Sequence, residues 1–563
     1  WNSDSTGGAA GAFQTATANT NDLFFVAGPS ATSGNVNYTV TVSGAQVARS
    51  LNFQAPATTT ISGGTSITLG NGTAGVGGIN VNQFAFGSTA QGAVNVNTSI
   101  ILANSQTWTN NSSSSVFASF GSGSAGTITN GGFDLTLDGT GTTRLWGSLS
   151  GTGGIIKNGA GKVTIGGQFS PAGLDHTYTG ATTINGGILQ MHSNDIGTGN
   201  IQITGGVLSQ YFGGTFTRNI GSASGEMRIT GGVSGFSTQG SGGVWTFTGA
   251  GSAPLVWGST GTNFAPTEFI LQASDANTNA TGTFTNNIDL NGATRTIRSD
   301  QAAGTGSGIF SGNITGTAKL VKVGIGLHNL SGAANTYDGG TDIDGGTLLF
   351  SRRTAMPATG AVTVKTGSAL GINLGDANGW STATSGVGTL GGLLSGIGGQ
   401  AGSTVAFQGD SGLLLNVAAT STYAGVIDNA GATNLSLIKS GSSTLTLTGD
   451  NTYTGGTVFS AGTLSADSAT ALGTTGNLTF QGGTLQYTAN SDSLNLGSRI
   501  KNSTSAITLD TNSRSVAISG IDSTAPFTNV LQRMIRSNRS ERDSKLEGYE
   551  LIHLSTSLAL KNG

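Results

Sequence analysis

The feature that most constrains this chain is a stretch of thirteen residues that occurs three times. It reads TYTGATTINGGIL at 177–189, TYDGGTDIDGGTL at 336–348 and TYTGGTVFSAGTL at 452–464. Each copy keeps its tyrosine, a threonine four residues later, a bulky apolar residue six residues later and a glycine nine residues later. Such repetition is typical of proteins that are built from stacked copies of one small structural unit.

Each copy predicts two short strands joined by a tight turn. The threonine and the apolar residue are two positions apart, so they fall on the same face of a strand, as Thr457 and Phe459 do in the third copy. The Gly-Gly or Ala-Gly pair that follows permits the positive φ of a turn. One such unit cannot bury its own apolar side. It needs a similar unit above and below it, which is the arrangement of a β-solenoid.

The composition also favours strands and turns. Glycine accounts for 96 of the 563 residues and proline for 7, while charged residues make up 9%, against roughly a quarter in ordinary globular proteins. Between the copies, apolar and polar residues alternate with glycine turns. In FDLTLDG, for example, we expect Phe133, Leu135 and Leu137 to point inward. We therefore predict an all-β, elongated parallel solenoid with roughly 22 residues in each coil.

The sequence divides into three parts. Residues 1–35 hold few apolar residues in register and suggest an N-terminal edge or cap. Residues 36–525 form the predicted solenoid, with repeat copies near 149–210, 314–374 and 424–487. Trp1 is an unusual first residue, so we expect a processed form or part of a longer protein.

From about Pro526 the chain becomes more charged. Four apolar residues there have helical spacing, namely Val530, Leu531, Met534 and Ile535. Residues 526–563 therefore suggest a C-terminal cap or tail that is helical in part. This segment either docks on the last coil, merely shields it, or is foreign to the native protein.

The repeat resembles the autotransporter-associated β-strand repeat, also called the passenger-associated transport repeat. Its pattern is Lys-x-Gly, a strand, Asn-Thr-Tyr-x-Gly-Gly-Thr, a strand and Gly-x-Leu. The segment from Lys439 to Leu464 matches it best, and the segment from Lys322 to Leu348 follows. The segment that begins at Lys157 has a longer loop and has His176 in the asparagine place.

This resemblance implies a right-handed parallel β-helix on a large, secreted or surface-exposed bacterial protein. It also implies an outer-membrane β-barrel at the C-terminus, which the sequence does not show. We expect either a passenger without its barrel or a relative that is exported by another route.

Three aspartates of the second copy, Asp338, Asp342 and Asp344, are the best candidates for catalysis. Paired carboxylates are what a glycosidase needs, and parallel β-helices often carry lyase or glycosidase sites. Asp342 and Asp344 share one strand face, but a solvated outer face explains them better. The same holds for Asp134 and Asp138.

No other constellation indicates a reaction or a cofactor. The chain has no cysteine, and its histidines, which are His176, His192, His328 and His553, have no zinc-binding spacing. Tyr178, Tyr337 and Tyr453 are possible sugar-stacking platforms, although we expect each to pack over its own turn. We therefore predict no catalytic, metal or cofactor residues.

Three possible functions follow. The first is a non-enzymatic extracellular protein of the bacterial cell surface, such as a fibre, sheath or adhesin. It would associate with itself end to end into fibres or a surface layer, or bind a host or polysaccharide ligand. The second is a polysaccharide-acting lyase or glycosidase. A third possibility is a passenger that presents another domain.

The net charge of −3 gives no indication of nucleic-acid binding, and we find no run of eighteen apolar residues that would span a membrane.

Overall fold

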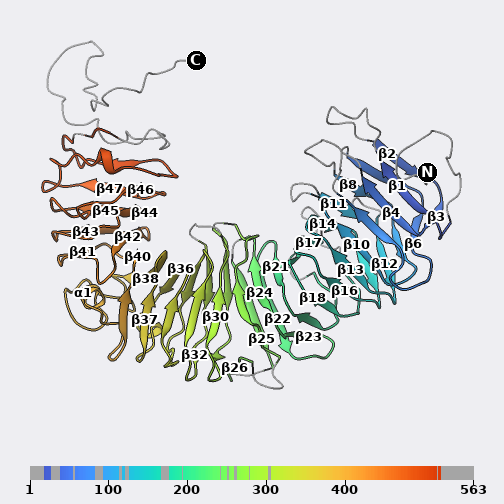
Figure 1. Cartoon of the computed structure of the whole chain (residues 1–563), viewed down its shortest axis with the longest axis horizontal. Coiled ribbons are helices and arrows are strands. Elements are labelled where there is room, and N and C mark those ends of the chain that lie inside the picture. The colour runs from blue at the N-terminus through green and yellow to red at the C-terminus, as the bar shows by residue number, and fades with distance from the viewer. Residues whose placement is uncertain are drawn as a thin grey trace, which may run out of the picture. The chain divides into compact units, whose positions relative to one another are not determined.

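The regular secondary structure of the computed structural model consists almost entirely of parallel β-strands, which are joined by turns and loops (Figure 1). It describes residues 18–520, except 27–37, 55–57, 83–92, 113–116, 121–125, 167–175, 193–194, 241, 250–252, 259–262, 278, 302–305 and 517. Within these residues there is one short α-helix, α1 (Leu390–Leu394), and there are two 3-10 helices, η1 (Arg353–Ala355) and η2 (Gly497–Arg499). The predicted solenoid and its all-β class are confirmed.

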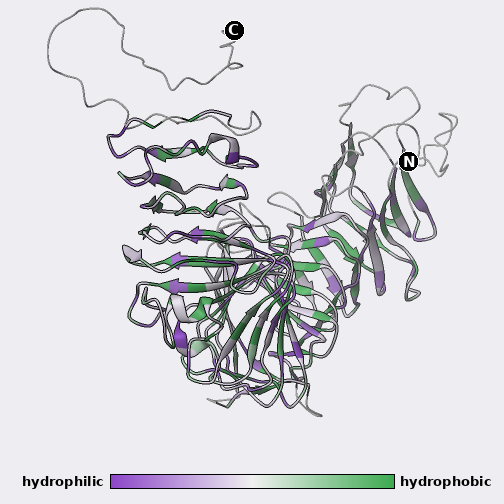
Figure 2. Ribbon diagram, turned by 60° about the vertical axis from the view of Figure 1, so that its left-hand side comes forward, coloured by the Kyte–Doolittle hydropathy of each residue, from purple (hydrophilic) through white to green (hydrophobic). Residues whose placement is uncertain are grey.

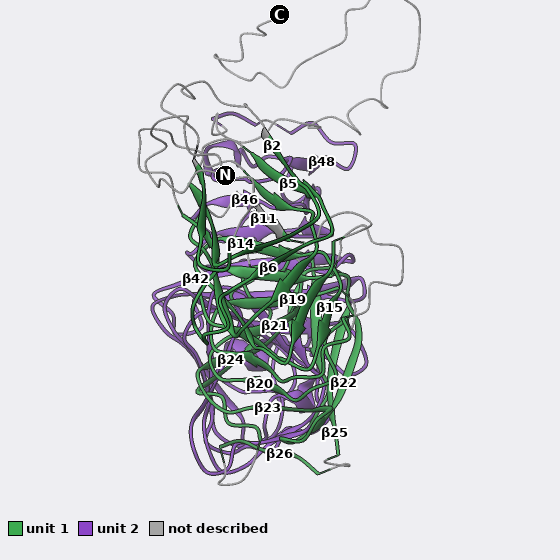
Figure 3. Ribbon diagram, turned by 90° about the vertical axis from the view of Figure 1, so that its right-hand side faces the viewer, with its two compact units in different colours: residues 1–286, 300–308 green, residues 287–299, 309–563 purple. Residues whose placement is uncertain are grey.

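The chain forms two compact units, which Figure 3 distinguishes by colour. Unit 1 comprises residues 1–286 and 300–308, and unit 2 comprises residues 287–299 and 309–563. Each unit contains parallel sheets that run along the stack of coils.

Unit 1 contains three sheets, which we name A, B and C. Sheet A consists of β1 (Asp22–Val26), β4 (Ser50–Gln54), β7 (Gly78–Val81), β10 (Gln106–Asn110), β13 (Leu135–Asp138), β16 (Ile155–Lys157), β18 (Thr182–Ile184), β20 (Ile201–Ile203), β22 (Gly214–Ile220), β23 (Glu226–Ile229), β25 (Gly243–Thr248) and β28 (Thr281–Phe284). Sheet B consists of β2 (Tyr38–Val42), β5 (Thr59–Gly63), β8 (Val94–Val96), β11 (Phe117–Phe120), β14 (Thr142–Leu145), β17 (Lys162–Ile165), β19 (Ile188–Met191), β21 (Val207–Gln210), β24 (Val233–Thr238) and β27 (Glu268–Leu271). Sheet C consists of β3 (Ala45–Ala48), β6 (Ser66–Leu69), β9 (Ile100–Leu102), β12 (Ile128–Gly131) and β15 (Leu149–Gly151).

Unit 2 also contains three sheets, which we name P, Q and R. Sheet P consists of β30 (Arg295–Arg298), β33 (Leu320–Val323), β35 (Thr341–Ile343), β37 (Ala361–Val364) and β39 (Thr404–Phe407). Sheet Q consists of β34 (Leu327–Leu330), β36 (Gly346–Phe350), β38 (Ser368–Leu374), β40 (Asp410–Val417), β42 (Asn434–Ser440), β44 (Thr457–Phe459) and β46 (Leu478–Phe480). Sheet R consists of β41 (Ser421–Tyr423), β43 (Thr444–Leu447), β45 (Thr463–Ala466), β47 (Thr484–Tyr487) and β48 (Thr508–Asp510). A short pair is formed by β29 (Ile288–Asp289) and β32 (Ile314–Thr315).

The chain coils because successive strands belong to different sheets. After β13 in sheet A it passes through β14 in sheet B and β15 in sheet C, and then returns to sheet A as β16. There β16 pairs with β13 in parallel, with Leu135 opposite Ile155. The backbone hydrogen bonds therefore run from one coil to the next along the stack.

The alternation of apolar and polar residues along the strands correctly predicts which side chains are buried in the core. In β18 Thr182 and Ile184 are buried and the residue between them is partly exposed, and the same pattern recurs in β35 and β44. Figure 2 shows apolar and polar residues mixed along the same strands. Phe133 was expected inward, but it is 37% exposed. The reason is that β13 begins at Leu135, so Phe133 belongs to the preceding turn, where its N–H donates to Asn130 O.

Unit 2 explains why the repeat copies are irregularly spaced. The second copy carries Lys322 in β33 of sheet P, whereas the third carries Lys439 in β42 of sheet Q. In between, β38 pairs with β40, where the bonded side chains of Asn373 and Asn416 are 43 residues apart. This is about twice the length of an ordinary coil, and the extra residues form a lateral segment that contains α1. After this segment the chain returns to sheet P, where β39 pairs with β37. The repeat nevertheless shifts by one sheet, because its second copy begins in sheet P and its third copy begins in sheet Q.

Both terminal predictions fall largely outside the described residues. Of residues 1–35, the structure describes 18–26, which include β1, and β1 pairs with β4 in sheet A. The proposed cap or tail at 526–563, with its helical spacing, lies outside the described residues altogether.

Each repeat copy has one tyrosine at a fixed position, which we call the signature tyrosine. The stacking of the coils requires the glycine nine residues after it. Gly187, Gly346 and Gly462 have φ values of +62°, +59° and +63°. A Cβ on any of them would lie 2.3–2.4 Å from a carbonyl oxygen of the preceding coil. Only glycine satisfies both the backbone conformation and this close approach.

We predict that Gly462→Ala destabilises its coil more than Gly44→Ala does. Gly44 has nearly the same φ, +64°, but a Cβ there has no atom within 4 Å. The two variants therefore have similar backbone strain. The difference between their losses of stability measures the clash of the new Cβ with Gly441 O, which should cost about 1–3 kcal/mol. Hydrogen exchange of peptides that span each position is the measurement, because long repeat arrays need not unfold in one step. Equal losses of protection would contradict this explanation.

Candidate functional site

The three signature tyrosines lie inside the solenoid. Tyr178, Tyr337 and Tyr453 are fully buried. Each hydroxyl shares a hydrogen bond with the threonine four residues later, at 2.6 Å to Thr182, for example. Burial raises the pKa of Tyr178 to about 12. The prediction that each tyrosine packs over its own turn is confirmed, and the alternative of a sugar-stacking platform is wrong.

The asparagine two residues before the tyrosine, which is present in the second and third copies, joins three successive coils. Asn451 Oδ1 accepts from Ile427 N at 2.8 Å, and its Nδ2 donates to Ala471 O at 2.7 Å. Asn335 makes the same two kinds of bond in the second copy. In the first copy His176 Nδ1 accepts from Leu149 N at 3.0 Å, so the imidazole takes over the acceptor role of the amide.

The signature lysines are buried as well and close the turns of two neighbouring coils. Lys439 Nζ donates to Ser440 O at 2.7 Å, to Gly441 O at 2.9 Å and to Ala461 O, in the next coil, at 3.0 Å. Lys322 makes three equivalent bonds, and Lys157 bonds to Gly159 O and Gly186 O. Each lysine lies opposite the apolar residue of the next strand, as Lys439 does with Phe459.

This arrangement fits the ammonium form of the lysine. Burial lowers the pKa of Lys157 and of Lys439 to about 8. Three carbonyl oxygens nevertheless match the three donors of an ammonium group, so the charged form is the one that satisfies the turn. The Lys-x-Gly part of the repeat is therefore a backbone clamp.

The aspartates of the second copy form a balanced ion-pair network. Asp342 lies 3.0 Å from Lys319 Nζ and 3.6 Å from Lys365 Nζ, and Asp344 lies 2.7 Å from Lys365 Nζ. The hydrogen bond that Lys365 Nζ donates to Asp344 is the main cause that raises the pKa of Lys365. Two carboxylates and two ammonium groups thus stabilise three adjacent coils on the outer face.

The remaining candidate aspartates support turns or face solvent. Asp134 Oδ1 accepts from Gly154 N and Asp138 Oδ1 from Gly139 N, both at 2.7 Å. Asp338 is exposed in the loop before β35. In these positions the carboxylates satisfy backbone donors or water.

The histidines occupy separate environments. His176 belongs to the asparagine position, His192 packs against Tyr211 and Phe212, and His328 is buried edge-on to Phe310. His553 lies outside the described residues. Within the part of the chain that the structure describes, no three His, Asp or Glu side chains are grouped as metal ligands would be.

Unit 1 also contains a cluster of hydrogen-bonded polar side chains that the repeat pattern did not predict. Asp275 accepts from Ser209 Oγ and Ser237 Oγ, both at 2.7 Å, and from Gln190 Nε2 at 3.3 Å. These partners come from β21, β24 and β19, so one loop carboxylate joins three coils on the outer side of sheet B. This cluster lies between repeat copies, where the sequence contains no recognisable motif.

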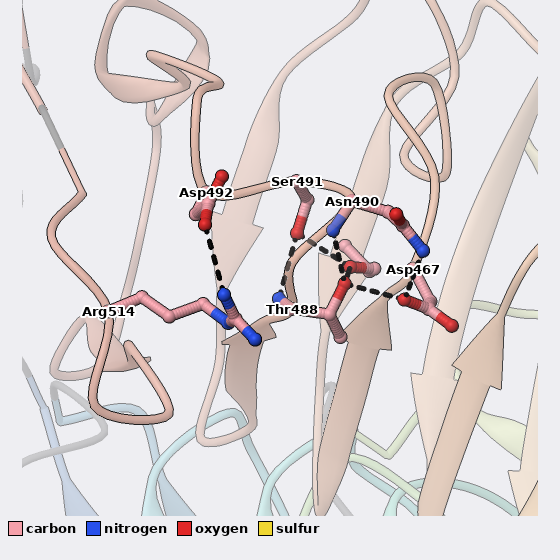
Figure 4. Close-up of polar contacts among 7 residues, drawn as sticks. Asp467, Thr488, Asn490, Ser491, Asp492 and Arg514 are labelled. Atoms are coloured by element: carbon pink, nitrogen blue, oxygen red, sulfur yellow. Dashed lines mark hydrogen bonds and ion pairs between the residues drawn. The ribbon is translucent and has the colours of Figure 1, made fainter.

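A second such network joins the last described coils of unit 2 (Figure 4). Asp467 Oδ1 accepts from Thr488 Oγ1 at 2.6 Å and from Asn490 Nδ2 at 3.0 Å. Ser491 Oγ accepts from Thr488 N at 3.0 Å, and Arg514 bonds to Asp492 at 3.2 Å. Short polar side chains thus continue the stack beyond the third copy.

The comparisons with known proteins agree with this geometry. Residues 155–191, 320–350 and 437–466 match the model of the passenger-associated-transport-repeat. This chain carries three passenger-associated transport repeats. Their lysine, asparagine, tyrosine and glycine positions are those that form the clamps and buried bonds above. The repeats imply a secreted or surface-exposed bacterial protein.

The chain is also distantly similar to a much longer protein. It is 29% identical over 377 residues to "Adhesin BmaC autotransporter" of Brucella suis biovar 1 (strain 1330). The match covers 65% of this chain and 8% of that protein. No solved structure matches the chain. Among the described residues, no helix is long and apolar enough to cross a membrane.

We predict that Lys439→Met opens the third passenger-associated transport repeat locally. The methionine fills the space but leaves three carbonyl oxygens without a donor, which should cost about 3 kcal/mol. Lys501→Met is the matched control, because Lys501 is exposed and its replacement should change stability by less than about 0.5 kcal/mol. Hydrogen exchange over 437–466 reports the loss, and unchanged protection would rule out the clamp.

Proposed function

We propose that this chain is a non-enzymatic, adhesive passenger segment that attaches a bacterium to a host or polysaccharide surface. The observation that carries the proposal is the similarity to the autotransporter adhesin over 65% of the chain. The name of that relative describes it as an adhesin, and we extend adhesion to this chain as a proposal.

The roles of the repeat residues support this proposal. The tyrosines and lysines that recur in the three repeat copies are all buried, and they hold the backbone together. The repeat thus supplies a stiff support and leaves the outward residues free to vary. Such a division suits a protein that displays contact surfaces at a distance from the cell.

Attachment can be measured with the purified chain on fluorescent beads. Beads coated with the folded chain should bind cultured epithelial cells or immobilised polysaccharide at least several-fold better than beads coated with the heat-unfolded chain. Coating density must be matched, so that the folded surface is the only variable. Equal attachment by the two kinds of bead would contradict the proposal.

The same preparation tests the enzymatic alternative. Release of sugar ends from a panel of polysaccharides by the wild type, but not by Asp342→Asn, would favour a polysaccharide-acting enzyme. The ion pairs of Asp342 with Lys319 and Lys365 favour a structural role for this carboxylate, so we expect no such release.

We further propose that copies of the chain associate end to end. The support is the parallel stacking itself, because the outermost strand of any such stack offers backbone groups to another strand. Among the described residues, β48 is paired along one edge, with β47. Electron microscopy at increasing protein concentration should show particles that lengthen. Particles of constant length up to the solubility limit would contradict this proposal.

A further inference from the structure

The first repeat has a histidine where the other two copies have an asparagine. His176 lies two residues before Tyr178, as Asn335 and Asn451 lie two residues before their own tyrosines. All three side chains accept a hydrogen bond from a backbone N–H of the preceding coil. His176 Nδ1 accepts from Leu149 N at 3.0 Å, and the two asparagines accept at 2.8 Å. An amide keeps its acceptor at every physiological pH, whereas an exposed imidazole gains a proton at about pH 6.5.

The bond to Leu149 determines which form of the imidazole the folded chain holds. A backbone N–H can only donate, so Nδ1 of His176 offers a lone pair, and the ring is neutral with its proton on Nε2. The residue is buried. Leu149 O in turn accepts from Thr177 N at 2.9 Å. We call this pair of bonds a joint, and the second and third repeats have the same joint at Ile314 and Ile427.

Protonation of the imidazole would remove the acceptor from the first joint. A positively charged imidazole carries an N–H on both nitrogens, so Nδ1–H of His176 would point at the N–H of Leu149. Two buried donors would then face each other without an acceptor between them. The joints at Ile314 and Ile427 are made by amides and contain no group that titrates in this pH range.

A carboxylate and a second histidine adjoin the other nitrogen of the ring. Asp195 Oδ2 lies 3.7 Å from His176 Nε2, and Asp195 Oδ1 accepts from the backbone N of His176 at 2.7 Å. A Cβ on Gly166 would lie 3.2 Å from Asp195 Oδ2 and 3.9 Å from His176 Nε2. The Cβ of His192 is 3.0 Å from the same point. These side chains therefore act on the ring from the side of Nε2.

Two further charged residues are near in the structure or in the sequence. Arg218 donates to Gly197 O, in the loop that follows Asp195. Asp175 directly precedes His176 and lies outside the described residues. Carboxylates favour a charged imidazole and cations oppose it. Because Nε2 carries a proton in both forms of the ring, the attraction of Asp195 for that nitrogen does not restore the acceptor at Nδ1.

We propose that His176 makes the first repeat sensitive to acid. Protonation of the imidazole opens the joint at Leu149 and loosens the two coils that meet there, whereas the joints at Ile314 and Ile427 stay closed. The closed joint needs the neutral ring. Its contribution to stability is therefore complete above about pH 6.5 and is lost as the pH falls below that value. The proposal holds whether or not the chain is an adhesin.

Hydrogen exchange of the full chain at about pH 7.5 and about pH 5 tests this proposal, after correction for the pH dependence of intrinsic exchange. Protection of peptides that contain residues 149–151 and 177–179 should fall at least about tenfold at the lower pH. The reason is that opening becomes up to about tenfold more favourable for each pH unit below the pKa of the exposed histidine. Peptides that contain Ile314 and Ile427 should change by less than about twofold. Unchanged protection of the first repeat, or an equal loss at all three joints, would overturn the proposal.

His176→Asn is the matched variant, because the other two repeats already hold an asparagine at this position. It should keep the first joint closed at both pH values. Asp195→Asn separates the histidine from its neighbouring carboxylate, because the amide oxygen can still accept from His176 N. The acid response should persist in this variant and be at least as large, since a charge that favours the protonated ring has been removed.

The variants also identify the titrating group. An acid response that survives His176→Asn would overturn the assignment, and its loss in Asp195→Asn would then make that carboxylate the sensor. Where a variant loses protection already at neutral pH, the comparison of the three joints within the wild type still decides the proposal.

Discussion

The structure depends on the register in which each coil lies over the one before it. Parallel strands repeat at about 4.8 Å along the stack, and at that spacing the turns of neighbouring coils leave almost no room for side chains. The repeat resolves this crowding with two residue types that act on the same backbone atoms. Gly462 lets the turn approach Gly441 O, and Lys439 donates a hydrogen bond to that same oxygen. A glycine and a buried lysine thus fix how two coils meet.

The conserved chemistry of the repeat therefore serves the backbone. Asn451 satisfies an N–H of one neighbouring coil and a C=O of the other, and Tyr453 satisfies a buried threonine hydroxyl. Each of these groups would be costly if buried without a partner. Where His176 stands in place of the asparagine, the imidazole retains the acceptor for Leu149 N.

The fold was predictable because period-two alternation and glycine turns are local signals. Thr182 and Ile184 fall on one buried face as their spacing requires. Phe133 shows the limit of such reasoning, because the pattern does not reveal that the strand starts two residues later. The buried role of the lysines was also out of reach, because a lysine after two apolar residues gives no indication that carbonyl oxygens surround it. Asp275 was missed for a related reason, since its partners are distant in sequence.

The shift of the repeat from sheet P to sheet Q affects how such a gene can evolve. A repeat that works on either sheet is not tied to whole turns of the solenoid, because its clamp involves only the coils directly next to it. Recombination between two copies can then delete or duplicate the intervening segment, and the coils that meet at the junction keep the register of the repeat. The number of coils can then change by recombination between copies.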